Sequence, residues 1–267
     1  SSRYSLSCMV IGAQDNDMQR DYAYTVSRKA SLLQSASAVG IEAAKATVDR
    51  LGARKINTAN VPVLLHRDIA SSLFGHYVGA ISGGSLYRRS SFLLDSLGKQ
   101  VFPEWLNIEE RPFIKGGLAS SSFDNEGVAC SDMTIVDGGK LATYLYTTYS
   151  SRKLNTRSNG HAGGIHNWLV GDTGHSDADL LKEMGTGLFV TELMGQGVNG
   201  VTGDYSRGAA GYWVENGIIQ YPVHEVTIAG NLKDMFKGIV AIGAEKDVRG
   251  SVQTGSVLID QMKIAGS

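Results

Sequence analysis

The chain has 267 residues, 42% of them apolar, so it is long enough to bury a large core in one domain or in one domain with part of another. Lysine and arginine together number 25 and aspartate and glutamate 26, which leaves a net charge of −1 and no excess of positive charge for a phosphate backbone. This balance argues against nucleic acid as a direct partner.

Cysteine usage and hydropathy predict the compartment. Cys8 and Cys130 are the two cysteines and form no CxxC pair, which fits a reducing compartment, so we interpret them as buried side chains. The sequence contains no run of about 18 apolar residues and does not open with the basic and apolar regions of a signal peptide. We therefore expect a cytoplasmic protein without a membrane span.

The first predicted elements are a hairpin and a helix. RYSLSCMVIGA (3–13) and MQRDYAYTVS (18–27) alternate in polarity around the turn QDND. A helix is predicted in SASAVGIEAAKATVDRLGARK (35–55), with its serines as candidates for the N-cap and Gly52 as its end. Its apolar face contains Val39, Ala43, Ala46 and Leu51. Because the chain opens on a hairpin, we expect residues 1–56 to be the end of a preceding, central domain.

The rest of the chain predicts an α+β fold, rich in antiparallel sheet and with several helices. Predicted strands are VPVLL (61–65), a long one at 141–154 and GLFVTELMG (187–195); predicted helices are 177–185 and 231–243, the latter with Asn231 as N-cap. YWVENGIIQYPV (212–223) is typical of a hairpin because Asn216 and Gly217 tolerate the positive φ angles of a type I′ turn.

An apolar helix that contains GHYVGAISGG (75–84) raises the question of a metal. A zinc helix of the protease type needs two histidines one turn apart and a glutamate beside the first. His76 is followed by Tyr77 and Val78, and His66 by Arg67 and then by no histidine within a turn. Neither histidine belongs to such a helix.

Three other histidines form the second candidate. His161 and His166 lie five residues apart in SNGHAGGIHNW (158–168), and His175 follows nine residues later. Three imidazoles have the chemistry to bind zinc, copper or nickel. The alternative is a glycine-rich loop whose histidines are hydrogen-bonded at its rim.

A third candidate is Arg207 in TGDYSRGAAGYW (202–213). The segment has no G-x-S-x-G elbow for a serine nucleophile. The guanidinium of Arg207 has the geometry to hold a peptide carboxylate, and the alternative is a structural ion pair with Asp204. None of the glycine clusters has the order of a phosphate-binding loop.

Long runs, in order over nearly the whole chain, resemble the PmbA (TldE) branch of the TldD/PmbA family. They are GHYVGAISGGSLYR, FLLDSLGKQ, GHAGGIHNW, LKEMGTGL, TELMGQGV, TGDYSRGAAGYWVENG, YPVHEVTIAGNLKDM and MKIAGS. The resemblance covers the C-terminal part of a family member. It implies that residues 57–267 are the PmbA/TldD C-terminal domain and that the family's N-terminal domain is absent from this chain.

The resemblance implies a heteromeric metalloprotease. In that family the TldD subunit has an HExxxH zinc helix and a later cysteine ligand, and the PmbA subunit pairs with it to degrade or trim unfolded and peptide substrates. Laid over that motif, the two histidine positions fall on Gly75 and Ala80, the glutamate on His76 and the cysteine near Thr254. The resemblance therefore implies no catalytic residue and no metal in this chain, with zinc in a TldD-like partner.

We expect this subunit to shape the substrate cavity, with His76, His161, His166 and Arg207 facing it. One alternative is an independent metalloenzyme that uses His161, His166 and His175. Another is a regulatory protein-binding module, as the family's older name, modulator of DNA gyrase, implies, and a homo-oligomer is a third.

Overall fold

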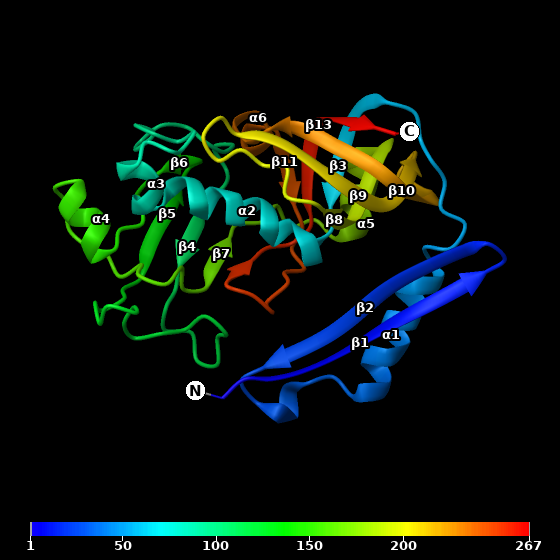
Figure 1. The fold of residues 1–267 in the computed structure, drawn as a ribbon, viewed down its shortest axis with the longest axis horizontal. Coiled ribbons are helices and arrows are strands. Elements are labelled where there is room, and N and C mark those ends of the chain that lie inside the picture. Colours follow the sequence, from blue (N-terminus) through cyan, green and yellow to red (C-terminus); the bar gives the residue numbers. More distant parts are fainter. Residues whose placement is uncertain (1, 267) are drawn as a thin grey trace.

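The first elements of the chain form a hairpin with a helix packed on it. The computed structural model describes residues 2–266, and β1 (Tyr4–Gln14) and β2 (Asp17–Ser27) pair antiparallel along their whole length. Helix α1 (Ala36–Val48) begins at the N-cap Ser35, as predicted. Its buried face differs slightly from the prediction, because Thr47 is fully buried while Ala46 is only half-buried. Figure 1 shows this unit along one side of the molecule.

Six strands form the larger sheet, in the order β10-β9-β8-β3-β13-β11. They are β3 (Ala59–Leu65), β8 (Gly187–Met194), β9 (Asp204–Glu215), β10 (Ile218–Asn231), β11 (Ile239–Ile242) and β13 (Val257–Ala265). The β3–β8 pair is parallel and the other pairs are antiparallel. Strand β10 also pairs with β13, which closes five of the six strands into a ring. The predicted turn between β9 and β10 is confirmed, with φ angles of 52° at Asn216 and 75° at Gly217.

Five short strands form the second sheet, in the order β12-β7-β4-β5-β6. They are β4 (Ile108–Glu110), β5 (Met133–Asp137), β6 (Lys140–Leu141), β7 (Trp168–Val170) and β12 (Val252–Gln253). The short helices are α3 (Gly83–Tyr87), α4 (Thr148–Lys153), α5 (Asp177–Met184) and α6 (Leu232–Lys237). With three sheets, the β1-β2 hairpin and two larger ones that are mainly antiparallel, and six α-helices among the described residues, the predicted α+β fold is confirmed.

Helix α2 (Arg67–Ile81) runs past both sheets (Figure 1). One face is fully buried through Phe74, Tyr77 and Ile81. The Tyr77 ring lies 4.9 Å from that of Phe102 and 5.9 Å from that of Trp168, centroid to centroid. At 15 residues α2 is the longest helix, and no described helix has the length and hydropathy needed to cross a membrane. The buried face fixes α2, so its other face has a defined position relative to both sheets.

Two predicted elements are wrong. The long strand expected at 141–154 is absent; its residues form the end of β6, an irregular segment and α4. Thr147 and Ser150 explain the helix, since they form a capping box in which each side chain accepts from the other's backbone N–H.

The predicted helix at 231–243 ends at Lys237, and β11 follows. A Cβ at Gly238 would meet the Asp234 carbonyl oxygen at 3.1 Å and the side chain of Asp260, so the chain turns away there. The β-branched run after Gly238 then pairs with β13. The N-cap prediction is confirmed, since Asn231 Oδ1 accepts from Lys233 N at 3.1 Å.

Candidate functional site

The exposed face of α2 lies between two cavities that meet at Gly75. The first, of about 540 Å³, is lined by α2 and by Gly163, Gly164 and Ile165, and we call it the loop-side cavity. The second, of about 330 Å³, is lined by α2 and by residues that include Gln196 and Val198, and we call it the strand-side cavity. A Cβ built at Gly75 would meet no atom within 4 Å, so the helix surface is open there.

His76 lies at the strand-side cavity, whereas Arg207, whose charge acts on His76, is not among the residues that line it. His76 lines this cavity, and its ring packs edge-on against Tyr205 of β9, with 5.9 Å between the centroids. Burial, with a smaller contribution from the charge of Arg207, lowers the pKa of His76 below its usual value. The buried atoms His76 Nε2 and Arg207 Nε have no hydrogen-bond partner among residues 2–266. A neutral imidazole and a cation are therefore both left with polar atoms unsatisfied.

The ion pair between Arg207 and Asp204 that the sequence also allowed does not form. Asp204 instead accepts hydrogen bonds from Thr202 Oγ1, at 2.6 Å, and from Asn231 Nδ2, at 3.1 Å. These contacts lower the pKa of the Asp204 carboxyl and hold it in the turn before β9. Arg207 is thus not neutralised by its neighbour in the sequence.

The positions on which the resemblance places the family's zinc ligands do not fit a zinc ion. Gly75 has no side chain, Ala80 contributes only a methyl group, and Thr254 is fully buried and donates to the Gly255 carbonyl oxygen at 3.2 Å. His76 alone supplies a donor, whereas a catalytic zinc site takes about three protein ligands. In the part of the chain that the structure describes, the one group of side chains spaced to hold a metal lies elsewhere.

That group is Glu110, His161 and His166, all buried. Glu110 Oε1 lies 3.1 Å from both His161 Nε2 and His166 Nδ1. Its other oxygen, Oε2, accepts hydrogen bonds from Trp168 Nε1 at 2.6 Å and from the His166 backbone N–H at 3.2 Å. The imidazoles face this carboxylate, while the glycines of their loop line the loop-side cavity.

Burial alone would raise the pKa of Glu110. The contacts that Glu110 makes with His161 and His166 outweigh burial and lower this pKa to about 2. Glu110 is therefore a carboxylate at neutral pH.

The loop that carries the two histidines has a backbone that needs its glycines. Gly160, Gly163 and Gly164 all have positive φ angles, of 82°, 103° and 131°. Asp124 anchors the loop by accepting from Ala162 N at 2.9 Å. Burial alone would raise the pKa of Asp124, but this and other backbone hydrogen bonds lower it.

Cys130 is buried, as predicted, and lies beside the loop, whereas Cys8, which was also predicted to be buried, is half-buried. Its Sγ is 3.6 Å from His166 Nε2 and 3.8 Å from the Gly160 carbonyl oxygen. Burial raises the pKa of this thiol, and Glu110 and Asp124 raise it further, so the sulfur is a neutral thiol.

The predicted set of three histidines does not form. His175 lies beside Thr173 Oγ1 at 2.7 Å and Glu183 at 3.9 Å, away from His161 and His166. The third member of the cluster is Glu110 instead of His175, and the sequence did not lead us to predict Glu110. A signal was present, because Leu106, Ile108 and Glu110 share one face at strand periodicity, and a carboxylate on a buried face needs partners.

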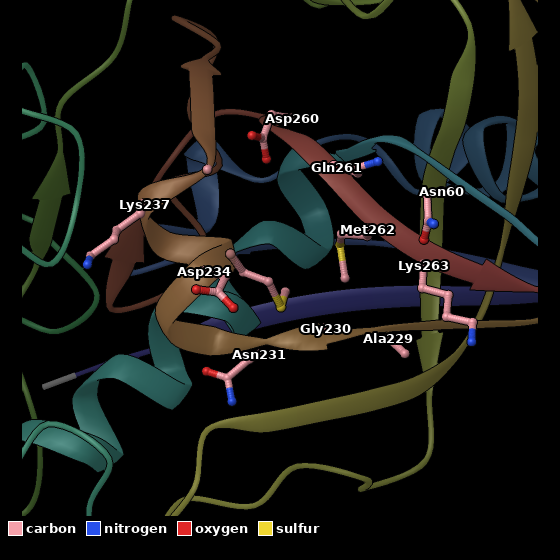
Figure 2. A pocket seen from close by; sticks show the side chains of 12 residues that line it. Asn60, Ala229, Gly230, Asn231, Asp234, Lys237, Asp260, Gln261, Met262 and Lys263 are labelled. Atoms are coloured by element: carbon pink, nitrogen blue, oxygen red, sulfur yellow. The ribbon is translucent and has the colours of Figure 1, made fainter.

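A separate cavity of about 550 Å³ lies between α6, β10 and β13 (Figure 2). Asp234, Lys237, Asp260 and Lys263 carry charges around it, and its lining also includes Met235 and Met262. It contains none of the residues that the sequence predicts for the site.

Comparisons with known proteins identify the family. The family model described as the PmbA/TldA metallopeptidase C-terminal domain matches residues 58–266. The chain is 58% identical over 266 residues to the metalloprotease PmbA of Escherichia coli O157:H7, and 57% identical over 269 residues to the PmbA homolog of Haemophilus influenzae. Both alignments span the whole of this chain but 59% of the relative's length.

Solved structures agree with this assignment. A candidate modulator of DNA gyrase from Bacteroides thetaiotaomicron superposes with a TM-score of 0.94 at 26% identity, over 99% of this chain and 60% of that one. Another from Thermotoga maritima gives 0.90 at 31% identity, over 98% and 62%. TldE from Thermococcus kodakarensis, at 19% identity, shares the fold with a TM-score of 0.87 over 99% and 63%. The chain therefore belongs to the PmbA/TldD metallopeptidase family, in its PmbA (TldE) branch.

Proposed function

We propose that this chain forms the non-catalytic subunit of a heteromeric zinc metalloprotease, paired with a TldD-like zinc subunit and acting on unfolded polypeptides or peptides. One observation carries the proposal: at the positions on which the resemblance places the family's zinc helix, α2 has an open, cavity-lined face where His76 is the one side chain able to bind a metal. The family membership supports the reaction class, peptide-bond hydrolysis.

The open face of α2 is suited to an extended peptide. Gly75 and Gly79 present backbone without side chains, so a peptide backbone can approach the helix closely. Cavities of about 540 and 330 Å³ have room for a few residues of an extended chain and not for a folded domain, which would select for unfolded chains. The zinc of the partner would polarise the scissile carbonyl and activate a water.

His76 would supply a polar contact at the strand-side cavity, and Arg207 lies near enough for its charge to act on His76. The Arg207 guanidinium suits a carboxylate, either a substrate C-terminus or an acidic side chain. The neutral imidazole of His76 adds a donor without adding charge. Both groups have a buried nitrogen without a partner, which a bound peptide would satisfy.

The test is peptide cleavage by the complex of this chain with its TldD-like partner. Gly75→Trp places an indole where the two cavities meet, and we expect it to lower cleavage at least tenfold while the complex still assembles. Gly40→Trp is the matched control, because Gly40 is also a helical glycine with open space at its Cβ but lies on α1.

Three results would contradict the proposal: full cleavage by the partner alone, unchanged cleavage by the Gly75→Trp complex, or a native mass in active fractions that corresponds to this chain without a second subunit. Arg207→Ala should raise KM for peptides with a free C-terminus more than for amidated ones.

A further inference from the structure

We propose that Glu110, His161 and His166 form a binding site for one divalent transition-metal ion of the zinc class, separate from α2. The proposal departs from the expectation that this chain holds no metal. It goes beyond the proposed function and does not depend on it.

The spacing of the three donors fits a metal. The two inner imidazole nitrogens, His161 Nε2 and His166 Nδ1, each lie 3.1 Å from Glu110 Oε1, and the ligand atoms all lie within 4.8 Å of one another. Ligands at about 2.0–2.1 Å from a tetrahedral zinc lie roughly 3.3–3.4 Å apart. The two nitrogen–oxygen separations therefore need to change by only a few tenths of an ångström to surround an ion, and the two nitrogens lie at most 4.8 Å apart.

The hydrogen bonds of His161 fix its tautomer. Its Nδ1 lies 2.9 Å from Asn159 Oδ1, and the orientation of that amide is set because Asn159 Nδ2 donates to the Tyr144 carbonyl oxygen at 2.8 Å. Nδ1 must therefore carry the proton. In the neutral ring, Nε2 then presents a lone pair to the carboxylate, and it has no hydrogen-bond partner among residues 2–266 although its side chain is only 2% exposed.

His166 has the same arrangement through Cys130. Its Sγ lies 3.8 Å from the Gly160 carbonyl oxygen and 3.6 Å from His166 Nε2. A thiol that donates to the carbonyl oxygen leaves its sulfur to accept from Nε2, and the inner nitrogen Nδ1, 3.1 Å from Glu110 Oε1, is then free to bind a cation.

The three side chains also make hydrogen bonds through the atoms that point away from the cluster, and these bonds are those expected around metal ligands. Bound histidines usually donate their second N–H to a protein acceptor, and bound carboxylates are hydrogen-bonded in turn. Here Asn159 and Cys130 hold the outer nitrogens, and Trp168 Nε1 and the His166 backbone hold Glu110 Oε2. Two imidazoles and one carboxylate suit zinc, iron, cobalt or nickel better than magnesium or calcium.

An ion here would fix the wall of the loop-side cavity. His161 and His166 flank Gly163, Gly164 and Ile165, which line that cavity. The role we assign to the ion is therefore structural: it would hold the loop that faces α2.

The experiment measures metal uptake by the purified chain after removal of bound metal with a chelator. We expect one equivalent of Zn²⁺ to bind, and Co²⁺ to give visible absorption bands that Zn²⁺ abolishes. Glu110→Gln keeps an oxygen for Trp168 but removes the charge, and His161→Ala removes a ligand. Each should weaken binding by more than the roughly 10- to 100-fold typical of outer contacts. His175→Ala, which removes a histidine beside Glu183 outside the cluster, should leave uptake unchanged.

The alternative is a purely ionic cluster, in which protons rather than a metal lie between the imidazoles and Glu110. Failure of the wild-type chain to take up one equivalent of Zn²⁺ or Co²⁺ would establish that alternative and overturn the proposal. This result is measured on the wild-type chain, so it does not depend on whether a substituted chain folds. Equal binding by wild type, Glu110→Gln and His161→Ala would overturn it as well.

Discussion

His76 makes the stability of the fold depend on pH in a predictable direction. Burial and the charge of Arg207 lower the pKa of His76 in the folded state below the ordinary value of 6.5. As pH falls through 6.5, the unfolded chain binds a proton that the folded chain does not, so folding loses stability until the pH is below the folded pKa. We expect His76→Asn to lose less thermal stability than wild type between pH 7.5 and pH 5.

The measurement is the difference in Tm between the two pH values, with His175→Asn as a control at a more exposed histidine. An equal loss of Tm in wild type and His76→Asn would contradict the prediction.

At the scale of single residues, the sequence identified His161 and His166 as candidates but did not predict their role. Which way each imidazole points depends on Glu110, a residue more than 50 positions away in the chain.

Replacing a glycine by alanine should change the free energy of unfolding in opposite directions at Gly40 and at Gly238, because their surroundings differ. Gly40 lies inside α1 with open space at its Cβ, so Gly40→Ala should raise the free energy of unfolding by about 0.5–1 kcal/mol. Gly238 lies between α6 and β11, where a Cβ would press on Asp234 and Asp260, so Gly238→Ala should lower it by about 1–3 kcal/mol. Urea unfolding measures both. A stabilising Gly238→Ala would show that the helix can continue past Lys237.

Elements whose ends are set by local chemistry were predictable. The Asn216-Gly217 turn and the caps at Ser35 and Asn231 depend on neighbouring residues and were found. The structure of residues 141–154 was not predicted correctly. Tyrosines and threonines favour a strand in isolation, whereas the capping box of Thr147 and Ser150 stabilises the start of a helix.

At the scale of the whole molecule, the hairpin unit β1-β2-α1 is joined to the rest by arginines. It has a small core of its own around Val39 and Ala43. Arg50 reaches Glu192 of β8 at 2.6 Å, and Arg20 reaches the same carboxylate at 3.4 Å. We expect Arg50→Met to weaken this junction by about 1.5–3 kcal/mol, since hydrogen bonds to charged groups contribute roughly that much.

Hydrogen exchange separates the two parts in this test. In Arg50→Met the amides of β1, β2 and α1 should exchange faster, while those of β3 and β8 should not change. Acceleration spread evenly over both parts would mean that they unfold as one unit.

The sequence predicted that the hairpin and helix exist, but it did not predict the contact between Arg50 and Glu192, because periodicity does not encode which distant carboxylate an arginine meets.

The closed ring of strands has a consequence for synthesis. Strand β13 pairs with β3, β10 and β11, yet it follows all three in the chain. A growing chain therefore leaves the ribosome with β3 and β10 as unpaired edges, and both stay open to other chains until residues 257–265 emerge. Synthesis that stalls shortly before β13 should yield a protein that aggregates through those edges, even though nearly all of its core is already made.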